Sequence, residues 1–418
     1  MKVVGGGLAG LAAAVRLGGA GFAVEVHEAR TFLGGRAASL PLQPGDRHSE
    51  RIDNCQHVLL RRCTALMDFY RRCGVASKIR FHRTLNLVCP DGKVDRISRD
   101  PLPAPLHLAR SLLTMRALDW RDKASLARCL LAVPRERERA DLDTMTFAEW
   151  LAEHGATARS LSRFWRPLIV SALNEEPDRA SALPALKVFG DGLLGGRKSY
   201  ELGIPSVTLD ELYSGTLAGR LEPSVRVLLG SKVSRIDPAS NEADYYVSAV
   251  PFDRVAALVP GLGIKGTVSQ FEHSPILGIH LWFDRRITRL KHAMLLDREM
   301  QWLFHRGGGY YLVVVSAARA LQSKPTAEIV DLAVAELRAF FPDARGAALT
   351  RSRVIREARA TYSARPGLER LRPGTRTRFP NVFLAGDWTA TGWPATMEGA
   401  VRSGYNAADA ILEAEGLR

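Results

Sequence analysis

The first ten residues constrain the fold more than any other segment of this 418-residue chain. A short apolar run, Val3-Val4, leads into Gly5-x-Gly7-x-x-Gly10 and then into an alanine-rich stretch typical of a helix. Glycines at this spacing permit a tight strand-to-helix turn, close backbone approach to a pyrophosphate, and close packing of helix on strand. The free amides and positive dipole end of such a helix attract phosphate. The segment therefore predicts a βαβ unit that binds a dinucleotide.

A second strand and an acidic residue follow the glycine turn. Residues 24–27 alternate between apolar and polar, and Glu28 comes next. An acid about 20 residues after the glycines is placed to hydrogen-bond the adenosine ribose. Up to this point the pattern fits NAD and FAD equally well.

Two further segments favour FAD. A Gly-Gly-Arg run occupies positions 34–36, and an apolar stretch over 382–385 ends in Gly386-Asp387. A carboxylate at the end of such a strand suits a hydrogen bond to the ribityl or phosphate region of a flavin, which a nicotinamide domain does not need. We therefore expect FAD to be held by segments from both ends of the chain.

These segments carry a resemblance to a known family. With its glycine turn, Glu28, Gly-Gly-Arg run and Gly386-Asp387, the chain resembles the FAD-dependent amine oxidase and carotenoid desaturase superfamily. Longer stretches are similar to the squalene-associated FAD enzymes of bacterial hopanoid pathways, the hydroxysqualene dehydroxylases. These stretches are residues 53–59, 101–106, 167–174, 280–284 and 386–400. The resemblance implies an α/β fold: a Rossmann-like FAD-binding domain of the glutathione reductase type, with an interleaved α+β substrate domain and a helical lid.

The length of the chain predicts more than one domain. Pattern and resemblance together assign residues 1–75, 200–262 and 375–418 to the FAD-binding domain. They assign residues 76–199 and 263–374 to the substrate domain. Apolar patterns predict strands over 225–229, 232–236, 245–250, 276–283 and 310–315, and helices across 101–185 and over 326–341.

The resemblance also implies a set of flavin-binding residues. They are Gly5, Gly7, Leu8, Ala9, Gly10, Glu28, Ala29, Arg30, Gly35, Arg36, Val233, Gly386, Asp387, Ala395, Thr396 and Met397. Among them, Val233 would offer backbone contacts to the adenine.

The last helix should direct its N-terminus at the flavin. Trp393-Pro394 precedes it, and proline suits the first helical position. Amides and dipole there would stabilise negative charge on the pyrimidine end of a reduced flavin. Amine oxidases usually carry an aromatic residue at the position of Thr396, so its absence argues against an amine substrate. For Glu398, in the first turn, a structural and a catalytic role both remain open.

The resemblance implies reductive removal of a hydroxyl group from hydroxysqualene to form squalene, with hydride from reduced FAD. An allylic hydroxyl needs a proton in order to leave. We expect His57 or Asp53 to donate it, because the loop that holds them would lie near flavin and substrate. The alternative for Asp53 and Asn54 is that they hold the loop through backbone hydrogen bonds. Residues expected to line the substrate site are Asn54, Gln56, His280, Trp282 and Trp393; for His280 a structural role is the alternative.

Two other functions fit the same fold. One is a carotenoid or phytoene-type desaturase, in which hydride moves from a C–H bond to the flavin. The other is a prenyl-lipid-binding protein that has lost its flavin. The intact Gly386-Asp387 and Gly-Gly-Arg segments weigh against the second.

The cysteines predict neither disulfides nor a metal site. Cys55, Cys63, Cys73, Cys89 and Cys129 form no Cys-x-x-Cys pair and no zinc-like spacing, so we expect reduced thiols. Cys55 stands where the family usually carries glycine. If that position required a positive φ, cysteine would be strained there.

The net charge of +14 has two explanations. The basic residues are spread along the chain, which disfavours nucleic acid and leaves an arginine-rich composition or an anionic membrane surface. Apolar stripes that include Leu108, Leu112 and Met115 lie beside Arg110 and Arg116, as in a soluble lid or an interfacial helix pair.

The cellular location is predicted from two kinds of segment that the sequence does not show, a membrane span and a signal peptide. No apolar run reaches the ~18 residues of a membrane span. The first strand begins at once and leaves no room for a signal peptide. We expect a cytoplasmic protein, in peripheral contact with the inner face of the cell membrane; the sequence does not identify its electron donor.

Overall fold

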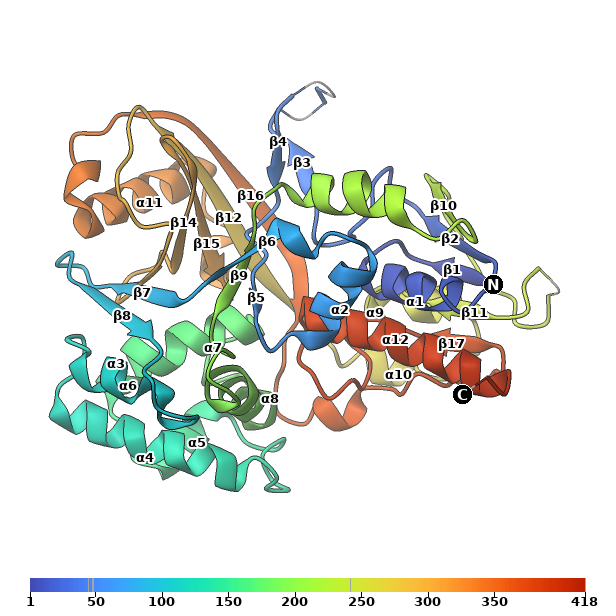
Figure 1. Ribbon diagram of the computed structural model, residues 1–418, viewed down its shortest axis with the longest axis horizontal. Helices are drawn as coiled ribbons and strands as arrows, with labels where there is room; N and C mark the ends of the chain where they lie inside the picture. Colours follow the sequence, from blue (N-terminus) through green and yellow to red (C-terminus); the bar gives the residue numbers. More distant parts are fainter. Residues whose placement is uncertain (44, 47–48, 241, 418) are drawn as a thin grey trace.

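The computed structural model describes residues 1–43, 45–46, 49–240 and 242–417. A five-stranded parallel sheet and a larger seven-stranded sheet organise the chain (Figure 1). In spatial order the parallel sheet consists of β10 (Val225–Leu229), β2 (Val24–Glu28), β1 (Lys2–Val4), β11 (Tyr246–Ser248) and β17 (Val382–Leu384). Its strands thus come from the beginning, the middle and the end of the sequence.

Two helices from opposite ends of the chain pack together beside the parallel sheet. They are α1 (Leu8–Gly18) and α12 (Met397–Ala414), and both chain ends lie on the same side of the molecule (Figure 1). A Cβ on Gly404 would come within 2.1 Å of the carbonyl oxygen of Ala9. The absence of a side chain on α12 therefore lets the two helices approach closely.

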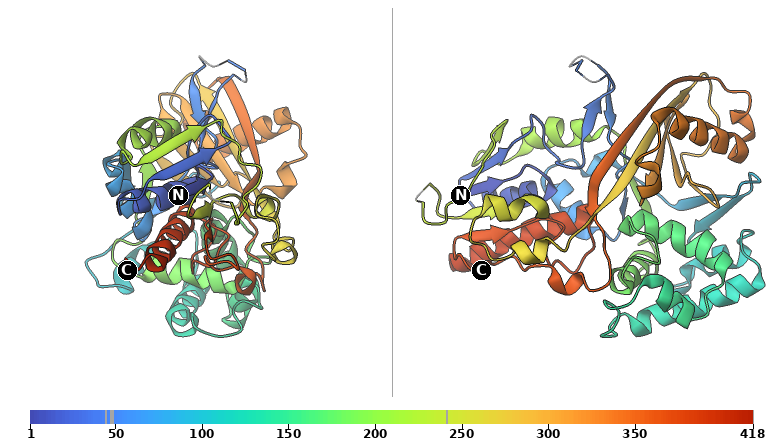
Figure 2. Two further views of the ribbon diagram at one scale, coloured as in Figure 1. Left: turned by 90° about the vertical axis from the view of Figure 1, so that its right-hand side faces the viewer. Right: turned by 180° about the vertical axis from the view of Figure 1, so that it is seen from behind.

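The seven-stranded sheet is antiparallel except for its β13–β7 pair. Its order is β16 (Leu349–Tyr362), β12 (His273–Phe283), β15 (Tyr310–Ser316), β14 (Trp302–Gly307), β13 (His292–Leu295), β7 (Thr84–Val88) and β8 (Val94–Ser98). The helix α11 (Thr326–Phe340) covers one face, where Ile279 and Leu281 are buried. Because side chains alternate along a strand, His280 points to the opposite face. The long pair β12–β16 runs between the two halves of the molecule (Figure 2).

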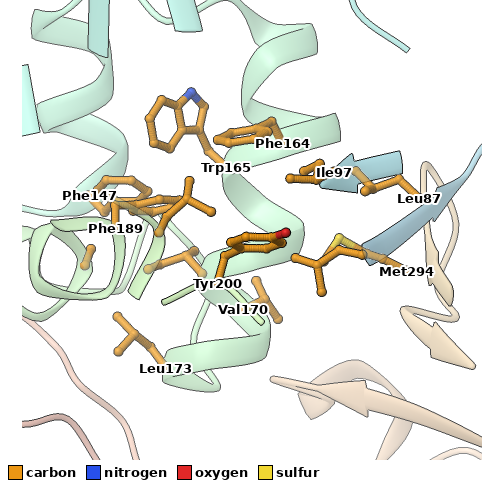
Figure 3. Packing of buried hydrophobic residues seen from close by; sticks show 14 of the residues in the cluster. Leu87, Ile97, Phe147, Phe164, Trp165, Val170, Leu173, Phe189, Tyr200 and Met294 are labelled. Atoms are coloured by element: carbon orange, nitrogen blue, oxygen red, sulfur yellow. The ribbon is translucent and has the colours of Figure 1, made fainter. Parts of the chain in front are cut away.

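Residues 109–194 form a mainly helical region. Its helices are α3 (Ala109–Thr114), α4 (Trp120–Glu136), α5 (Phe147–Glu153), α6 (Ala158–Ser160), α7 (Arg166–Leu173) and α8 (Ala182–Lys187), with π-helical turns at Leu161–Trp165 and Val188–Leu194. Aromatic rings fill its interior: Trp165 meets Phe189 edge to face at 4.7 Å, and Phe147 stacks on Phe189 at 5.5 Å. Figure 3 shows these rings continuing into Leu87 and Met294 of the seven-stranded sheet.

Smaller elements connect these parts. They are β3 (Ser39–Pro41), β4 (Arg51–Asp53), β5 (Leu59–Leu60), β6 (Ile79–His82), β9 (Leu202–Pro205), α2 (Thr64–Arg72), α9 (Phe252–Leu258), α10 (Lys265–Val268) and a π-helical segment at Glu211–Leu217.

Most predicted elements are present, and two predictions were wrong. The segment 232–236 belongs to no sheet, because Gly230 at φ +69° ends β10 and the amide of Ser231 bonds the carbonyl of Glu28 across the end of β2. Pro394 does not occupy the first helical position. The helix α12 begins at Met397, with Thr396 as its N-cap.

Candidate functional site

The two glycine-rich segments lie backbone to backbone. The amide of Gly34 donates to the carbonyl of Gly6 at 2.9 Å, and Gly7 forms a parallel bridge with Gly34. A Cβ on Gly35 would come within 3.0 Å of the Gly7 Cα. The 34–36 segment therefore covers the turn that leads into α1 without placing a side chain over it.

The N-terminus of α1 is buried and uncapped. Gly7 is its N-cap and supplies no side chain, and the first intrahelical bond runs from Leu11 N to Gly7 O. Among the described residues, nothing accepts a hydrogen bond from the amides of Leu8, Ala9 or Gly10. Buried helix ends normally have partners for these amides, so this end could hold an anionic group. A pyrophosphate meets that requirement.

Glu28 lies directly beside this turn. One carboxylate oxygen accepts from Gly6 N at 2.7 Å, and the other accepts from Arg30 N at 2.8 Å. Each oxygen keeps a further lone pair for a hydroxyl group. The geometry therefore leaves Glu28 able to bind a ribose, as the sequence predicts. Arg30 also reaches forward, because its guanidinium donates to the carbonyl of Gly35 at 2.9 Å.

The C-terminal strand ends against the Gly-Gly-Arg segment. Arg36 Nη2 and Asp387 Oδ1 are 2.5 Å apart. The adjacent Gly386 has a φ of +145°, and a Cβ there would collide with the Trp388 ring at 2.4 Å. The buried guanidinium of Arg372 fixes the same segment by donating to the carbonyl of Asp387 at 3.0 Å. These contacts place a carboxylate and a guanidinium where the two ends of the chain meet.

The first turn of α12 has a structural task. Thr396 caps the helix by accepting from Gly399 N at 3.2 Å. The fully buried carboxylate of Glu398 accepts from Ala65 N at 3.1 Å and Leu66 N at 2.8 Å, which are the first amides of α2. Of the two roles left open for Glu398, the geometry supports the structural one, because the carboxylate caps a neighbouring helix.

Asp53 is an ion-paired anchor in the loop that was expected near the substrate. It accepts from Ser39 Oγ at 2.7 Å and from Leu209 N at 2.8 Å. Its second oxygen pairs with Arg306 Nη2 at 2.9 Å, and Arg306 also donates to Gln56 Oε1 at 3.0 Å. Both oxygens of this carboxylate are therefore engaged within the fold, one of them by a guanidinium, and this supports an anchoring role for Asp53.

His57 is a neutral ring in the same loop. Its Nδ1 lies 3.2 Å from the carbonyl oxygen of Cys55, so Nδ1 carries the hydrogen and Nε2 presents a lone pair. Burial lowers the pKa of His57, which favours the uncharged form. Asn54 ties this loop to the cofactor segment by donating to the carbonyl of Arg36 at 2.8 Å. Cys55 does not have a positive φ, so the strain considered for it is absent.

His280 lies under this loop and is fully buried. Its Nδ1 is 2.7 Å from the hydroxyl of Tyr310. Burial, reinforced by the positive charge of Arg306, lowers the pKa of His280 to about 3. Trp282 stacks on Tyr310 with ring centres 4.4 Å apart. His280 is therefore an uncharged packing residue rather than an acid.

The remaining predicted site residues are more scattered. The cations of Lys187 and Arg402 lie 5.2 and 4.9 Å from the centre of the Trp393 ring, which has no contact with the polar cluster of Asp53, Gln56, His280 and Arg306. Val233, expected to offer its backbone to adenine, packs against the apolar cluster around Tyr246.

Sequence reasoning missed Arg306 and a network at the end of α7. Asn174 has a φ of +54°, and its amide group bonds Ala317 N at 2.6 Å and Ser274 O at 2.9 Å. The neighbouring Glu175 forms a bidentate pair with Arg319 at 2.8 and 2.6 Å. This network joins the helical region to the seven-stranded sheet, which gives the 167–174 motif a structural explanation. No local signal in the sequence pointed to Arg306.

The described part of the chain contains no cluster of His, Cys, Asp and Glu able to hold a metal ion. Within that same part, no helix combines the length and apolarity needed to cross a membrane.

Comparisons with known proteins agree with this geometry. The family described as flavin containing amine oxidoreductase matches residues 8–412. Hydroxysqualene dehydroxylases of Rhodopseudomonas palustris and Sinorhizobium fredii are each 30% identical to the chain, over 99% of it and 98% of their own length. A probable zeta-carotene desaturase of Synechococcus elongatus is 27% identical over 100% of this chain and 99% of its own.

Solved structures show the same fold. A triple mutant of putrescine oxidase superposes with a TM-score of 0.75 at 18% identity, covering 99% of this chain and 98% of its own. Cyclohexylamine oxidase from Brevibacterium oxydans superposes with a TM-score of 0.71 at 19% identity, covering 99% of each chain. The predicted α/β class with a flavin-binding fold is thereby confirmed.

Proposed function

The chain belongs to the flavin-containing amine oxidoreductase family and is an FAD-dependent oxidoreductase, and from this premise we propose that it converts hydroxysqualene to squalene. The observation that carries the proposal is the 30% identity to two hydroxysqualene dehydroxylases over almost the whole of both chains. Identity to the carotene and phytoene desaturases of Synechococcus elongatus is lower, at 27% and 24%. The substrate class common to these relatives is a long isoprenoid.

The chain offers FAD four matching contacts. The unpartnered amides of α1 would hold the pyrophosphate, and Glu28 would hold the adenosine ribose. Asp387 and Arg36 would hold the ribityl and phosphate region, and the N-terminus of α12 would face the pyrimidine end. When bound, FAD supplies the redox step, a hydride transfer. The same contacts weigh against a flavin-free lipid carrier.

The protein's own task is to protonate the leaving hydroxyl group. A hydroxyl leaves as water only after its oxygen gains a proton. We propose that His57 Nε2 accepts a hydrogen bond from the substrate hydroxyl while the ring is neutral. Uptake of a proton from solvent at Nε2 gives the charged ring, which transfers that proton to the hydroxyl oxygen and returns to the neutral form. Asp53 serves as the counter-ion of Arg306 and keeps the loop in place.

The surroundings suit a hydrocarbon better than an amine. Thr396, at the position where amine oxidases carry an aromatic ring, uses its hydroxyl to cap α12. A charged amine needs a partner when it is desolvated, whereas a hydrocarbon does not.

The test uses the purified FAD-loaded protein under anaerobic conditions. Hydroxysqualene and dithionite-reduced enzyme should yield squalene in an amount equal to the substrate consumed, detected by mass spectrometry. The Gly7→Val variant, which we expect to lack FAD, serves as the matched blank. Formation of new double bonds in phytoene with an added electron acceptor, together with no squalene, would assign the protein to the desaturases instead.

A further inference from the structure

Exposed apolar side chains are concentrated in one stretch of the sequence, from the loop after β8 to the start of α4, outside the candidate site. Leu102, Leu106, Leu113 and Trp120 are 46%, 54%, 54% and 73% exposed. They belong to the loop after β8, to α3 and to the first position of α4 (Figure 1). Single exposed apolar residues are ordinary on a protein surface, but several in one short stretch indicate an interaction site.

Basic side chains accompany these residues. Arg110, Arg116, Arg121 and Arg128 are all exposed, and among the described residues none of them pairs with a carboxylate within 4.0 Å. The ammonium of Lys123 lies 4.9 Å from the centre of the Trp120 ring. These residues and the four apolar ones all come from one short stretch of the chain, and we call them the 102–128 patch. Their exposed side chains are apolar and cationic.

The two acidic residues of this stretch do not neutralise it. Asp119 and Asp122 form a capping box at the start of α4, in which each carboxylate accepts from the other's amide, at 2.9 and 3.0 Å. Asp119 also pairs with Arg159 at 3.1 Å, and Asp122 accepts from Thr157 at 2.6 Å. Both carboxylates are therefore used within the fold, and the arginines of the patch keep their charge for another partner.

We propose that the 102–128 patch docks on the surface of an anionic lipid bilayer. A bilayer interface offers apolar depth for leucine and tryptophan and anionic headgroups for arginine at the same place. Tryptophan at the edge of such a patch is well suited to the headgroup level, where its ring is half buried. The inference rests on exposure and charge alone and does not depend on which substrate the enzyme reduces.

The test measures co-sedimentation of the FAD-loaded protein with phosphatidylcholine vesicles, with and without phosphatidylglycerol. We expect binding to the anionic vesicles that is lost at high salt. Replacing Arg116 and Arg121 by Gln should weaken it about fivefold for each arginine. The variants Leu113→Glu and Trp120→Glu should weaken it further, because a charge there opposes insertion.

Matched controls come from exposed residues elsewhere. Leu229 is 46% exposed on β10, and the side chain of Arg226 is 72% exposed, so Leu229→Glu and Arg226→Gln should bind vesicles like the wild type. Bound flavin and melting temperature report that every variant is folded. Equal binding by patch and control variants, or equal binding to neutral and anionic vesicles, would overturn the proposal. So would a dimer in solution that Leu113→Glu dissociates, because the patch would then join two copies of the chain.

Discussion

Arg36 Nη2 and Asp387 Oδ1 lie 2.5 Å apart although 351 positions separate the two residues. The carboxylate side chain is 7% exposed, and the guanidinium also donates to the carbonyl of Ala360 at 2.9 Å. This ion pair marks the point where the first and last segments of the flavin-binding fold meet. The pair therefore links cofactor binding to the closure of the fold.

Removing one partner of this pair should weaken both flavin affinity and stability. We expect Arg36→Met to lower FAD affinity about tenfold or more. We also expect it to cost about 1–3 kcal/mol of unfolding free energy, because the Asp387 carboxylate is left without its partner. Flavin fluorescence titration and urea unfolding measure the two effects. The double variant with Asp387→Asn should recover part of the stability but not the affinity; recovery of both would show that the pair has no part in cofactor binding.

Substitutions at Gly7 and at Gly10 should have different effects, because the first should remove FAD binding and the second should disturb folding. A Cβ on Gly7 would meet only the Gly35 Cα at 3.7 Å, and the backbone there has a φ of −78°, which any residue can adopt. Gly7→Val should therefore fold yet lose FAD, because its side chain occupies the path of the pyrophosphate. A Cβ on Gly10 would lie 1.9 Å from the Gly5 carbonyl oxygen, so Gly10→Ala should fail to fold normally. Circular dichroism and absorbance near 450 nm distinguish the two, and full flavin content in Gly7→Val would contradict the assignment.

The role proposed for His57 predicts a pH dependence of activity. Burial lowers its pKa below the ordinary value of 6.5, so the protonated, donating form becomes more populated as the pH falls below that value. Dehydroxylation rates should rise as the pH decreases from 8 toward 6. We expect His57→Gln to lose about 10²–10⁴-fold in kcat and to lose this slope as well. An unchanged pH profile in the variant would place the proton donor elsewhere.

Arg306 should be needed for stability, because it pairs with the buried carboxylate of Asp53. Arg306→Met leaves a carboxylate that is 2% exposed without its cation, which should cost about 3–5 kcal/mol of unfolding free energy. Adding Asp53→Asn should restore much of that loss, and urea unfolding measures both variants. If Asp53→Asn alone abolished activity while stability and flavin content stayed normal, Asp53 would regain the role of proton donor.

His280 should make the protein less stable in acid. Its folded pKa of about 3 lies below the unfolded value of 6.5, so between these limits the unfolded chain binds a proton that the folded chain does not. Stability should therefore fall with decreasing pH, by up to about 1.4 kcal/mol per pH unit from this residue. The variant His280→Gln should be less stable at pH 7 but should show a shallower decline between pH 6.5 and 4. Denaturant unfolding at several pH values checks this, and an unaltered slope would contradict it.

By itself, the sequence determined the flavin-binding unit. The glycine turn, the strand ending at Glu28 and the terminal Gly386-Asp387 are local patterns, and each is sufficient to specify a short piece of backbone. The resemblance along the whole chain identified the family and predicted FAD as the cofactor. The strand predicted over 232–236 was wrong because a segment forms a strand only when a partner strand lies beside it.

The chemical roles of the side chains at the site depend on contacts that the folded chain creates. Arg306 reaches Gln56 across 250 positions, and no local pattern records that contact. The same guanidinium pairs with Asp53 and gives that carboxylate an anchoring role in the fold. Burial makes His280 a neutral packing residue, although its alternating strand position alone is compatible with a half-exposed ring. Charge state depends on desolvation and on neighbouring charges, and both are properties of the folded chain rather than of its sequence neighbours.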